Sequence, residues 1–354
     1  MIKVLVVDDS AFMRKAISEI LESDPKIKVI DTARNGAHMF EKIEYIGKEN
    51  IDVITLDINM PVMDGKEALE KLKQDGFEIP VVIISSLTTE EANITLELLD
   101  LGAFDFITKP SGTISLDIHK VSAEIIEKVK NAAKNKGRVR RLFTKKIHRK
   151  PIESITTPKR NLAEFVVAIG ISTGGPATLI DILQDVDPIP ENVAFLVVQH
   201  MPPQFTPSLA ERLSQYSSIQ FYHTAHGQSI LGGYGYLAPG GWHMQITQAK
   251  KARLFKDDKY IYYPSVDVLF YSVAEVYKEN SIGILLTGIG RDGAEGLLEM
   301  KKQGAYTIAE SEETAVVYGM PRAAKEIGAA IKILPAYNIA REINLKLKRL
   351  KGGL

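Results

Sequence analysis

The chain has 354 residues, with 44 Lys or Arg, 44 Asp or Glu, and no cysteine. Its length favours two or three domains. The balanced charge gives no global field toward nucleic acid or an anionic membrane, and the lack of cysteine excludes disulfides, thiolate catalysis and cysteine-ligated zinc. The apolar run in the opening MIKVLVVDDS is too short for a signal peptide, and no stretch approaches the roughly 20 apolar residues that cross a bilayer. We therefore expect a cytoplasmic protein without membrane insertion.

Residues 1–125 alternate short β-branched runs with segments that have a helical pattern. The runs are IKVLVV, KVIDTA, DVITLD, PVVIIS and AFDFIT, and the last helical pattern is DIHKVSAEIIEKVKNAAK. Strands that alternate with helices are typical of parallel sheets covered on both faces. The pattern predicts an α/β domain with a doubly wound, five-stranded parallel sheet.

A basic segment follows. Residues 134–160 hold eleven Lys or Arg against one acidic residue, Glu153, with two prolines and no sustained hydrophobic period. We interpret residues 126–160 as the end of the last helix and a basic interdomain linker. A solvated spacer is the simpler interpretation, and an electrostatic contact with an acidic surface is the alternative. A linker that bound nucleic acid would give strongly salt-dependent retention on DNA; we expect no nucleic-acid partner.

The alternation resumes over residues 161–354. The β-branched runs are EFVVAIG, VAFLVVQH, GYGYLAPG, SIGILLTG and AYTIAE, and helical patterns separate several of them. They predict a second, larger, Rossmann-like α/β domain with a mixed, mostly parallel sheet. Because the two regions share no sequence period, we do not expect an internal repeat.

Polar residues follow four of the five strands expected in the first domain: Asp8 and Asp9, Asp57, Ser85, and Lys109. Since the carboxyl ends of parallel strands meet at one edge of a sheet, these side chains should lie close together. Carboxylates that gather there repel one another unless a cation joins them, and hard oxygen ligands suit Mg²⁺. The metal and the lysine would neutralise a phosphoryl group arriving on Asp57. A strand-end aspartate can also be a helix cap, and Asp9 could be one.

The first 120 residues resemble the receiver domain of response regulators. The resemblance is carried by VDDS, LDINMPVMDG, the Ser85 hydroxyl, Phe106 and the KP pair at 109–110. It implies that a sensor histidine kinase phosphorylates Asp57. It implies a set of Mg²⁺ ligands: Asp8, Asp9, Asp57 and the Asn59 carbonyl. It also implies residues that respond to the phosphoryl group: Ser85, Lys109 and the rotamer switch Phe106. The peptide bond between residues 109 and 110 is often cis in this family.

The stretch GISTGGP, residues 170–176, satisfies G-x-S-x-G between an expected strand and an expected helix. In that context Ser172 would sit exposed at a tight turn, and backbone amides at the helix start could stabilise an oxyanion. A glycine-rich turn of this kind can instead cradle a phosphate. The phosphate interpretation lacks support, because no Walker lysine follows and G-x-G-x-x-G is absent.

A serine nucleophile needs a base and an orienting acid. The second region offers four histidines: His200, His223, His226 and His243. His200 ends a strand as Ser172 does, whereas the two histidines of HTAHGQ are expected at the surface. His243 follows a turn and could either contact substrate or pack. Asp292 lies between a strand and a helix and is the candidate acid, with capping of that helix as its alternative role. The chain order Ser, His, Asp differs from that of α/β-hydrolases.

Residues 161–350 resemble the catalytic domain of the chemotaxis protein-glutamate methylesterases, which are also protein-glutamine glutaminases. The matching stretches are GISTGGP, QHMPPQFTPSLAERL, APGGWHM, PSVDVLFYSVA, LTGIGRDGAEGL and VVYGMP. The resemblance implies a phosphorylation-activated hydrolase that needs no cofactor for hydrolysis. Its substrates would be glutamate γ-methyl esters, and selected glutamines, of methyl-accepting chemotaxis receptors. It also implies an oxyanion and substrate loop: Thr173, Gly174 and Ile289.

Two positions depart from the family pattern. Ile289 stands where the family usually has methionine, and Ala225 stands where an acidic residue is common. The first change should matter little, because that position is expected to act through its backbone amide. Two other functions remain as alternatives: a receiver-regulated serine hydrolase of small esters, and a phosphorylation-gated binding module with an inactive triad.

Overall fold

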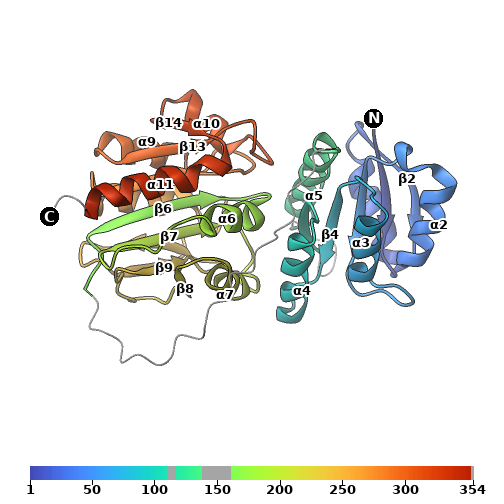
Figure 1. The fold of residues 1–354 in the computed structure, drawn as a ribbon. Helices are drawn as coiled ribbons and strands as arrows, with labels where there is room; N and C mark the ends of the chain where they lie inside the picture. Colours follow the sequence, from blue (N-terminus) through green and yellow to red (C-terminus); the bar gives the residue numbers. More distant parts are fainter. Residues whose placement is uncertain (110–116, 138–160, 352–354) are drawn as a thin grey trace. The chain divides into compact units, whose positions relative to one another are not determined.

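The computed structural model describes residues 1–109, 117–137 and 161–351. The chain divides into two compact units, Met1–Leu142 and Phe143–Leu354 (Figure 1). Most of the expected basic linker, and the peptide bond between residues 109 and 110, lie outside the described residues.

The first unit contains one five-stranded parallel sheet with the order β2-β1-β3-β4-β5. Its strands are β1 (Ile2–Val7), β2 (Ile27–Ala33), β3 (Val53–Asp57), β4 (Val81–Ser85) and β5 (Asp105–Thr108). All residues of β3 and β4 are buried, as continuous apolar runs of a sheet covered on both faces should be. This strand order is flavodoxin-like and confirms the predicted fold of this region. The strand order reverses between β1 and β3, so the expected phosphorylation site lies at the topological switch point.

Helices connect these strands: α1 (Ala11–Glu22), α2 (Gly36–Ile46), the short 3₁₀ helix η1 (Lys48–Asn50), α3 (Gly65–Gln74) and α4 (Thr89–Asp100). A last helix, α5 (Asp117–Lys134), follows β5. Three of these helices start where a polar side chain accepts a hydrogen bond from the first turn, namely Ser10 for α1, Asn35 for α2 and Thr88 for α4. At α3, Asp64 and Glu67 form a reciprocal capping box. Each of these capped helices begins shortly after the strand that precedes it, near the edge where the strands end.

The second unit has a seven-stranded sheet with the order β14-β13-β12-β6-β7-β9-β8. Its strands are β6 (Phe165–Ile171), β7 (Val193–Gln199), β8 (Gln220–His223), β9 (Tyr234–Leu237), β12 (Ser281–Leu285), β13 (Tyr306–Glu310) and β14 (Lys332–Leu334). Every pairing between these strands is parallel. The antiparallel pairing that a mixed sheet would contain occurs instead in a separate two-stranded ribbon, β10 (His243–Ile246) with β11 (Ala252–Phe255).

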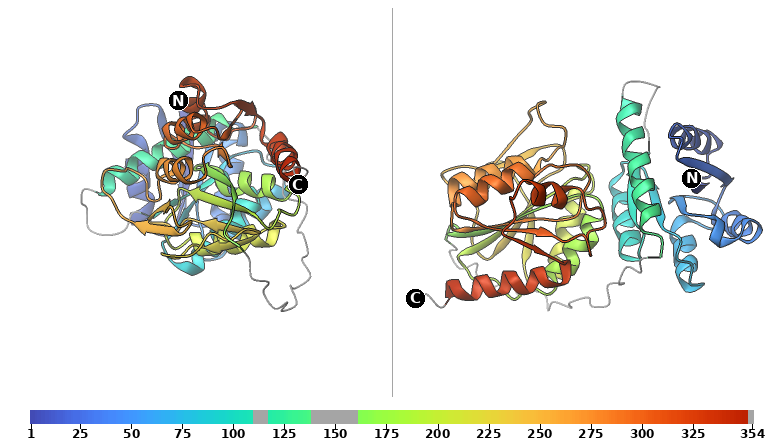
Figure 2. Two further views of the ribbon diagram at one scale, coloured as in Figure 1. Left: turned by 90° about the vertical axis from the view of Figure 1, so that its left-hand side faces the viewer. Right: turned by 90° about the horizontal axis from the view of Figure 1, so that it is seen from above.

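Helices cover both faces of the larger sheet (Figure 2). They are α6 (Gly175–Leu183), α7 (Thr206–Tyr216), α8 (Val266–Tyr277), α9 (Ala294–Lys302), α10 (Met320–Glu326) and α11 (Ala336–Lys351). On one face α6 packs against α7 and α11, and on the other α9 packs against α8 and α10. Because α6 is covered by its neighbours, almost all of its residues are buried and apolar. In the part of the chain that the structure describes, no helix is both long and apolar enough to cross a membrane.

The centre of this sheet positions the candidate site. β6 pairs with β12 on one side and with β7 on the other, so the chain leaves β6 in one direction and returns on its opposite side. Such a reversal opens a crevice at the carboxyl ends of the three strands. Ser172, His200 and Asp292 follow these three strands along the chain.

Candidate active site

Ser172 follows β6 directly and lies in a tight turn before α6. Its backbone N–H donates to the Thr287 carbonyl at 2.9 Å, and its own carbonyl accepts from the Gly175 N–H at 2.8 Å. Gly174, the N-cap of α6, has a φ of +73°, in the left-handed region that favours glycine. A Cβ at this position would also lie only 2.7 Å from Val316. The glycines therefore form the turn, and the partly buried Ser172 hydroxyl is left at the strand end.

His200 follows β7 and lies between the serine and the acid. Its Nδ1 is 3.1 Å from the Ser172 Oγ, and its Nε2 is 2.7 Å from the Asp292 Oδ2. An ionised carboxylate can only accept hydrogen bonds, so the imidazole proton lies on Nε2. Nδ1 is then free to accept the serine proton. The three side chains have the geometry of a nucleophile, a base and an orienting acid.

Asp292 is buried and accepts three more hydrogen bonds. They come from the Ser265 hydroxyl at 2.8 Å, the Val266 N–H at 2.7 Å and the Asp267 N–H at 3.2 Å. Burial alone would raise the pKa of Asp292, but the His200 partner and these donors together lower it. Two of the donors are the first backbone amides of α8. Asp292 therefore caps α8 and not the following helix α9, whose N-cap is Gly293.

Gln199, which directly precedes His200, is a site residue that the sequence analysis did not identify. Its Nε2 donates at 3.0 Å to both the Ser172 and the His200 carbonyl oxygens. One buried amide thereby ties the backbone of the serine to the backbone of the base. A polar residue at the buried end of the apolar run VAFLVVQH is the signal that could have revealed it.

His243 packs and does not contact solvent. Its side chain is fully buried, and its ring lies among Phe255, Tyr260 and Tyr263. Its Nδ1 accepts from the Ser265 N–H at 3.2 Å, and burial lowers the pKa of His243. Of its two possible roles, a packing role is therefore the one that fits. The two histidines of HTAHGQ are exposed, as expected.

The loop after β12 runs beside the serine. A Cβ at Gly288 would lie 2.7 Å from the Ser172 Cβ, so Ile289 follows a residue in close contact with the nucleophile. Across the site, Thr173 is buried and its carbonyl accepts from the Thr287 hydroxyl at 2.9 Å. The three residues expected to form the oxyanion and substrate loop thus flank Ser172.

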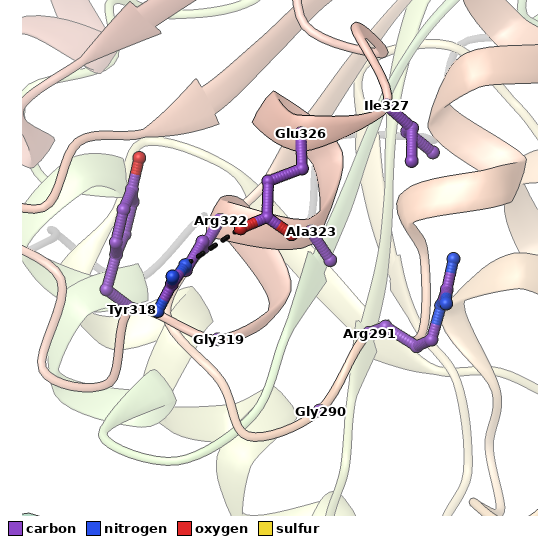
Figure 3. A pocket seen from close by; sticks show the side chains of 8 residues that line it. All are labelled: Gly290, Arg291, Tyr318, Gly319, Arg322, Ala323, Glu326 and Ile327. Atoms are coloured by element: carbon purple, nitrogen blue, oxygen red, sulfur yellow. Dashed lines mark hydrogen bonds and ion pairs between the residues drawn. The ribbon is translucent and has the colours of Figure 1, made fainter.

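A cavity of about 400 Å³ begins one residue after Ile289. Figure 3 shows its lining, with the Arg322 side chain joined to Glu326. Arg322 Nε is 2.9 Å from the Glu326 carboxylate, and Arg291 pairs in the same way with Glu295 at 2.8 Å. The cavity is lined by Gly290, Arg291, Tyr318, Gly319, Arg322, Ala323, Glu326 and Ile327. Two arginines and a glutamate thus line a cavity that starts at the residue after Ile289.

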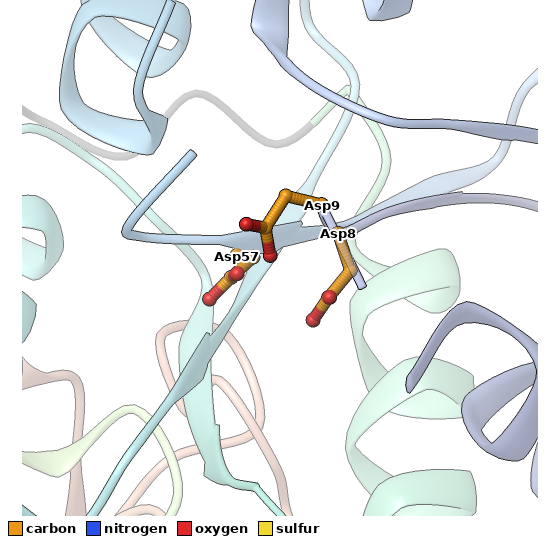
Figure 4. A group of neighbouring side chains, drawn as sticks. All are labelled: Asp8, Asp9 and Asp57. Carbon is orange, nitrogen blue, oxygen red and sulfur yellow. The ribbon is translucent and has the colours of Figure 1, made fainter. Parts of the chain in front are cut away.

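The first unit brings its expected carboxylates together. Figure 4 shows Asp8, Asp9 and Asp57 side by side. One carboxylate oxygen from each residue lies within 4.8 Å of those from the other two. Lys109 Nζ is 2.7 Å from the Asp57 Oδ1 and 3.5 Å from the Asp8 Oδ2. The Oδ2 atoms of Asp8 and Asp57 are buried and accept no hydrogen bond in the described part of the chain. Buried carboxylate oxygens of this kind fit a hard divalent cation such as Mg²⁺.

The environment of Asp57 favours its protonated form. Burial raises the pKa of Asp57 to about 6, the charge of Asp8 adds to the rise, and Lys109 opposes it. A bound cation would offset the penalty that burial and the Asp8 charge place on the ionised carboxylate. The site is therefore poised to gain positive charge.

Of the expected switch residues, Lys109 reaches Asp57, whereas Ser85 faces elsewhere. The Ser85 hydroxyl accepts from Thr95 at 2.8 Å and donates toward the Ser86 carbonyl at 3.2 Å. Phe106 is buried, with Lys128 Nζ 5.0 Å from its ring centroid. The Asn59 side chain donates to Glu91 at 2.7 Å. Glu91 also accepts from the Ser86 N–H, and the sequence analysis did not identify it.

Comparison with known proteins gives two family matches. The family described as CheB methylesterase matches residues 167–343, and the family described as response regulator receiver domain matches residues 4–119. A relative from Caldanaerobacter subterraneus, named protein-glutamate methylesterase/protein-glutamine glutaminase, is 46% identical over 96% of this chain and 95% of its own length. A relative of the same name from Bacillus subtilis is 41% identical over 99% of each chain. The solved catalytic domain of the Thermotoga maritima CheB methylesterase is 39% identical, with a TM-score of 0.48, and covers 52% of this chain and 98% of its own.

The match at 46% identity extends over nearly the full length of both chains. The two family matches follow one another along this chain in the order predicted from the motifs, receiver then catalytic domain. The chain is a hydrolase that belongs to the receiver-linked CheB methylesterase family, whose curated members are named protein-glutamate methylesterase/protein-glutamine glutaminase.

Proposed function

We propose that this protein demethylates glutamate γ-methyl esters of methyl-accepting chemotaxis receptors, and deamidates selected glutamines, by a Ser-His-Asp mechanism. The observation that carries the proposal is the continuous line of hydrogen bonds from Ser172 through His200 to Asp292. The names of its relatives support the choice of substrate.

The reaction proceeds through an acyl-enzyme. Ser172 Oγ attacks the ester carbonyl carbon as His200 Nδ1 takes the hydroxyl proton. The tetrahedral intermediate then collapses, and His200 returns the proton to the departing methanol. Water, deprotonated by the same nitrogen, attacks the acyl-enzyme. His200 then returns this proton to Ser172 Oγ as the glutamate leaves. With a glutamine substrate the leaving group is ammonia, and the other steps are unchanged.

Two parts of the site support the charged states. The backbone amides of Thr173, Gly174 and Ile289 are the candidate donors to the oxyanion, since all three residues flank the serine. Asp292 stabilises the imidazolium of His200 when the base is charged, and it holds the ring in the tautomer that leaves Nδ1 free.

The first domain, residues 1–125, acts as the regulator in this proposal, and residues 161–354 form the hydrolase. A sensor histidine kinase donates a phosphoryl group to Asp57, and Asp8, Asp9, Asp57 and the Asn59 carbonyl hold Mg²⁺. The cation supplies the positive charge that an incoming phosphoryl group needs. Lys109 is already at Asp57, while Ser85 and Phe106 reorient after phosphorylation. We place this exchange in the cytoplasm.

Methanol release from methylated receptor membranes tests the proposal. The wild-type protein should release methanol, and acetyl phosphate with Mg²⁺ should increase the rate. Ser172→Ala should release none beyond background, and a fluorophosphonate should label the wild-type protein but not this variant. If short acyl esters react well and receptor membranes do not, the protein is a small-ester hydrolase. If neither reacts and Ser172 is not labelled, it is a binding module.

A further inference from the structure

Tyr262 covers one face of the His200 ring. The two ring centroids are 4.3 Å apart and the ring planes differ by 7°, so the rings are stacked. Tyr262 is partly buried and lies in the segment between β11 and α8, far from His200 in the chain. Both nitrogens of His200 already contact Ser172 and Asp292 in the plane of the ring. The face of the ring is therefore the remaining direction from which a neighbour can influence its charge.

The Tyr262 hydroxyl also approaches the loop beyond Ile289. A Cβ added at Gly290 would lie 3.2 Å from the Tyr262 oxygen, so the phenol spans from the base to this loop. Gly290 has a φ of +84°, which favours glycine in its own right. Tyr262 is thus held between the base and a wall of the cavity described above.

We propose that Tyr262 is a positioning residue for His200, which fixes the plane of the imidazole and stabilises the imidazolium through the face of the phenol ring. The inference rests on the proposed triad. A cation over an aromatic face is attracted by the ring quadrupole, and the attraction grows when water is excluded. The neutral imidazole gains less from the same contact, so the stacking favours the state in which the base holds the serine proton. An interaction stronger in the transition state than in the ground state accelerates the reaction.

The other groups around His200 act from different directions. Asp292 stabilises the imidazolium in the ring plane. The Asp267 N–H donates to Asp292, and His243 accepts from the N–H of Ser265, whose hydroxyl also donates to Asp292. Ser172 is neutral. A change at Tyr262 leaves all of these groups in place, so its effect on the pH dependence can be assigned to the stacked ring.

The test compares two substitutions in the full-length protein. Tyr262→Leu keeps an apolar cover of similar size but removes the π face, and Tyr262→Phe removes only the hydroxyl. The rate of Ser172 labelling by a small fluorophosphonate is measured from pH 5 to 9, together with kcat/KM on methylated receptor membranes. The labelling reaction needs the base but not the receptor, so a defect in substrate binding does not affect it. The matched control is Tyr337→Leu, at an exposed tyrosine of α11.

We expect Tyr262→Leu to lower the pH-independent rate about 3- to 30-fold in both reactions. Its acid limb, which reports protonation of the base in the free enzyme, should move about 0.5 to 1 unit to lower pH, because the charged base has lost a stabilising contact. Tyr262→Phe and Tyr337→Leu should keep the wild-type limb and stay within about twofold of its rate.

An unmoved acid limb in Tyr262→Leu would overturn the inference whatever its rate, because a ring that only fills space would not change the protonation of the base. Circular dichroism checks that each variant is folded. If Tyr262→Leu is not folded, Tyr262→Met, which also lacks an aromatic face, replaces it, and an unmoved limb in that variant overturns the inference. A failure of the proposed function looks different: the wild-type protein itself would then show no labelling of Ser172 at any pH.

Discussion

Replacing Asp292 by asparagine removes one negative charge and keeps the shape of the side chain. In the wild-type protein Oδ2 accepts from His200 and Val266, both at 2.7 Å. Oδ1 accepts from Ser265 at 2.8 Å and from the Asp267 N–H at 3.2 Å. Every one of the four contacts is a donor, so the NH₂ group of asparagine must face donors wherever it lies. The outcome depends on which oxygen it replaces.

The hydrogen bonds favour one orientation. An NH₂ at the Oδ2 position would face the two shortest contacts, and it would drive the imidazole proton to Nδ1, where it blocks the base. An NH₂ at the Oδ1 position would face the longest contact, from Asp267, and the Ser265 hydroxyl, which can rotate and accept. We therefore expect Asp292→Asn to keep its oxygen toward His200 and to preserve the productive tautomer.

The expected loss then comes from the charge alone. A hydrogen bond to a charged group contributes about 1.5–3 kcal/mol and a neutral one about 0.5–1.5 kcal/mol, and the imidazolium also loses its ion pair. A total of about 2–3.5 kcal/mol in the transition state corresponds to a fall in kcat of about 30- to 400-fold. The wrong tautomer would lower kcat about 10⁴-fold, as it does when asparagine replaces the orienting aspartate of a serine protease.

The assay is initial methanol release at saturating receptor and acetyl phosphate, with Ser172→Ala as the background. Asp187→Asn is the control for the charge, because Asp187 is exposed and pairs only at the surface with Lys348. A wild-type rate in Asp292→Asn would show that Asp292 does not act on the base. A loss near 10⁴-fold would refute the orientation argument, because the amide nitrogen would then face His200.

Three further results are expected. His200→Ala should lose nearly all turnover while its circular dichroism stays that of the wild type; an active variant would rule out His200 as the base. Asp57→Asn should keep basal methanol release but lose the increase with acetyl phosphate, and chelating Mg²⁺ should do the same to the wild-type protein, whereas surviving stimulation would mean another acceptor. Burial raises the pKa of Asp267 to about 6 from an ordinary value of 3.8. The ionised carboxylate therefore lowers the free energy of unfolding above pH 6, and this loss disappears as the pH falls from 6 toward 4. Asp267→Asn can keep the bond from the Gly296 N–H and should raise the unfolding free energy by about 1–2 kcal/mol at pH 7.5 but not at pH 4, as measured by urea titration; an equal gain at both would refute the raised pKa.

The sequence predicts which residues belong to the site of the second unit, because the end of a strand can be recognised in the sequence as the end of an apolar run. Ser172, His200 and Asp292 each stand at or just beyond an apolar run, which is enough to place them at one edge of a parallel sheet. Their contact depends on strand order, and the runs do not encode that order. Nothing local indicates that β6 lies between β7 and β12, three elements spread over more than 100 residues.

The motifs do not predict contacts that are made by backbone groups or by the faces of aromatic rings. Asp292 reads as a cap for the helix that follows it, yet it caps α8, which begins earlier in the chain. Tyr262 lies in YIYYPS, where several tyrosines are equivalent by pattern and only one stacks on the base. In the first unit the Ser85 hydroxyl points to Thr95, a choice of rotamer that residue type does not determine.

The first glycine of G-x-S-x-G links the serine to its acid. A Cβ at Gly170 would lie 2.1 Å from a Val266 methyl group, so β6 can accept the start of α8 beside it only with glycine at this position. Val266 is also the residue whose N–H donates to Asp292 at 2.7 Å. The approach of α8 thus brings the positive end of its dipole and its free amides to the carboxylate, and both favour the ionised form. The motif that places Ser172 at the strand end therefore also makes room for the helix that keeps Asp292 charged.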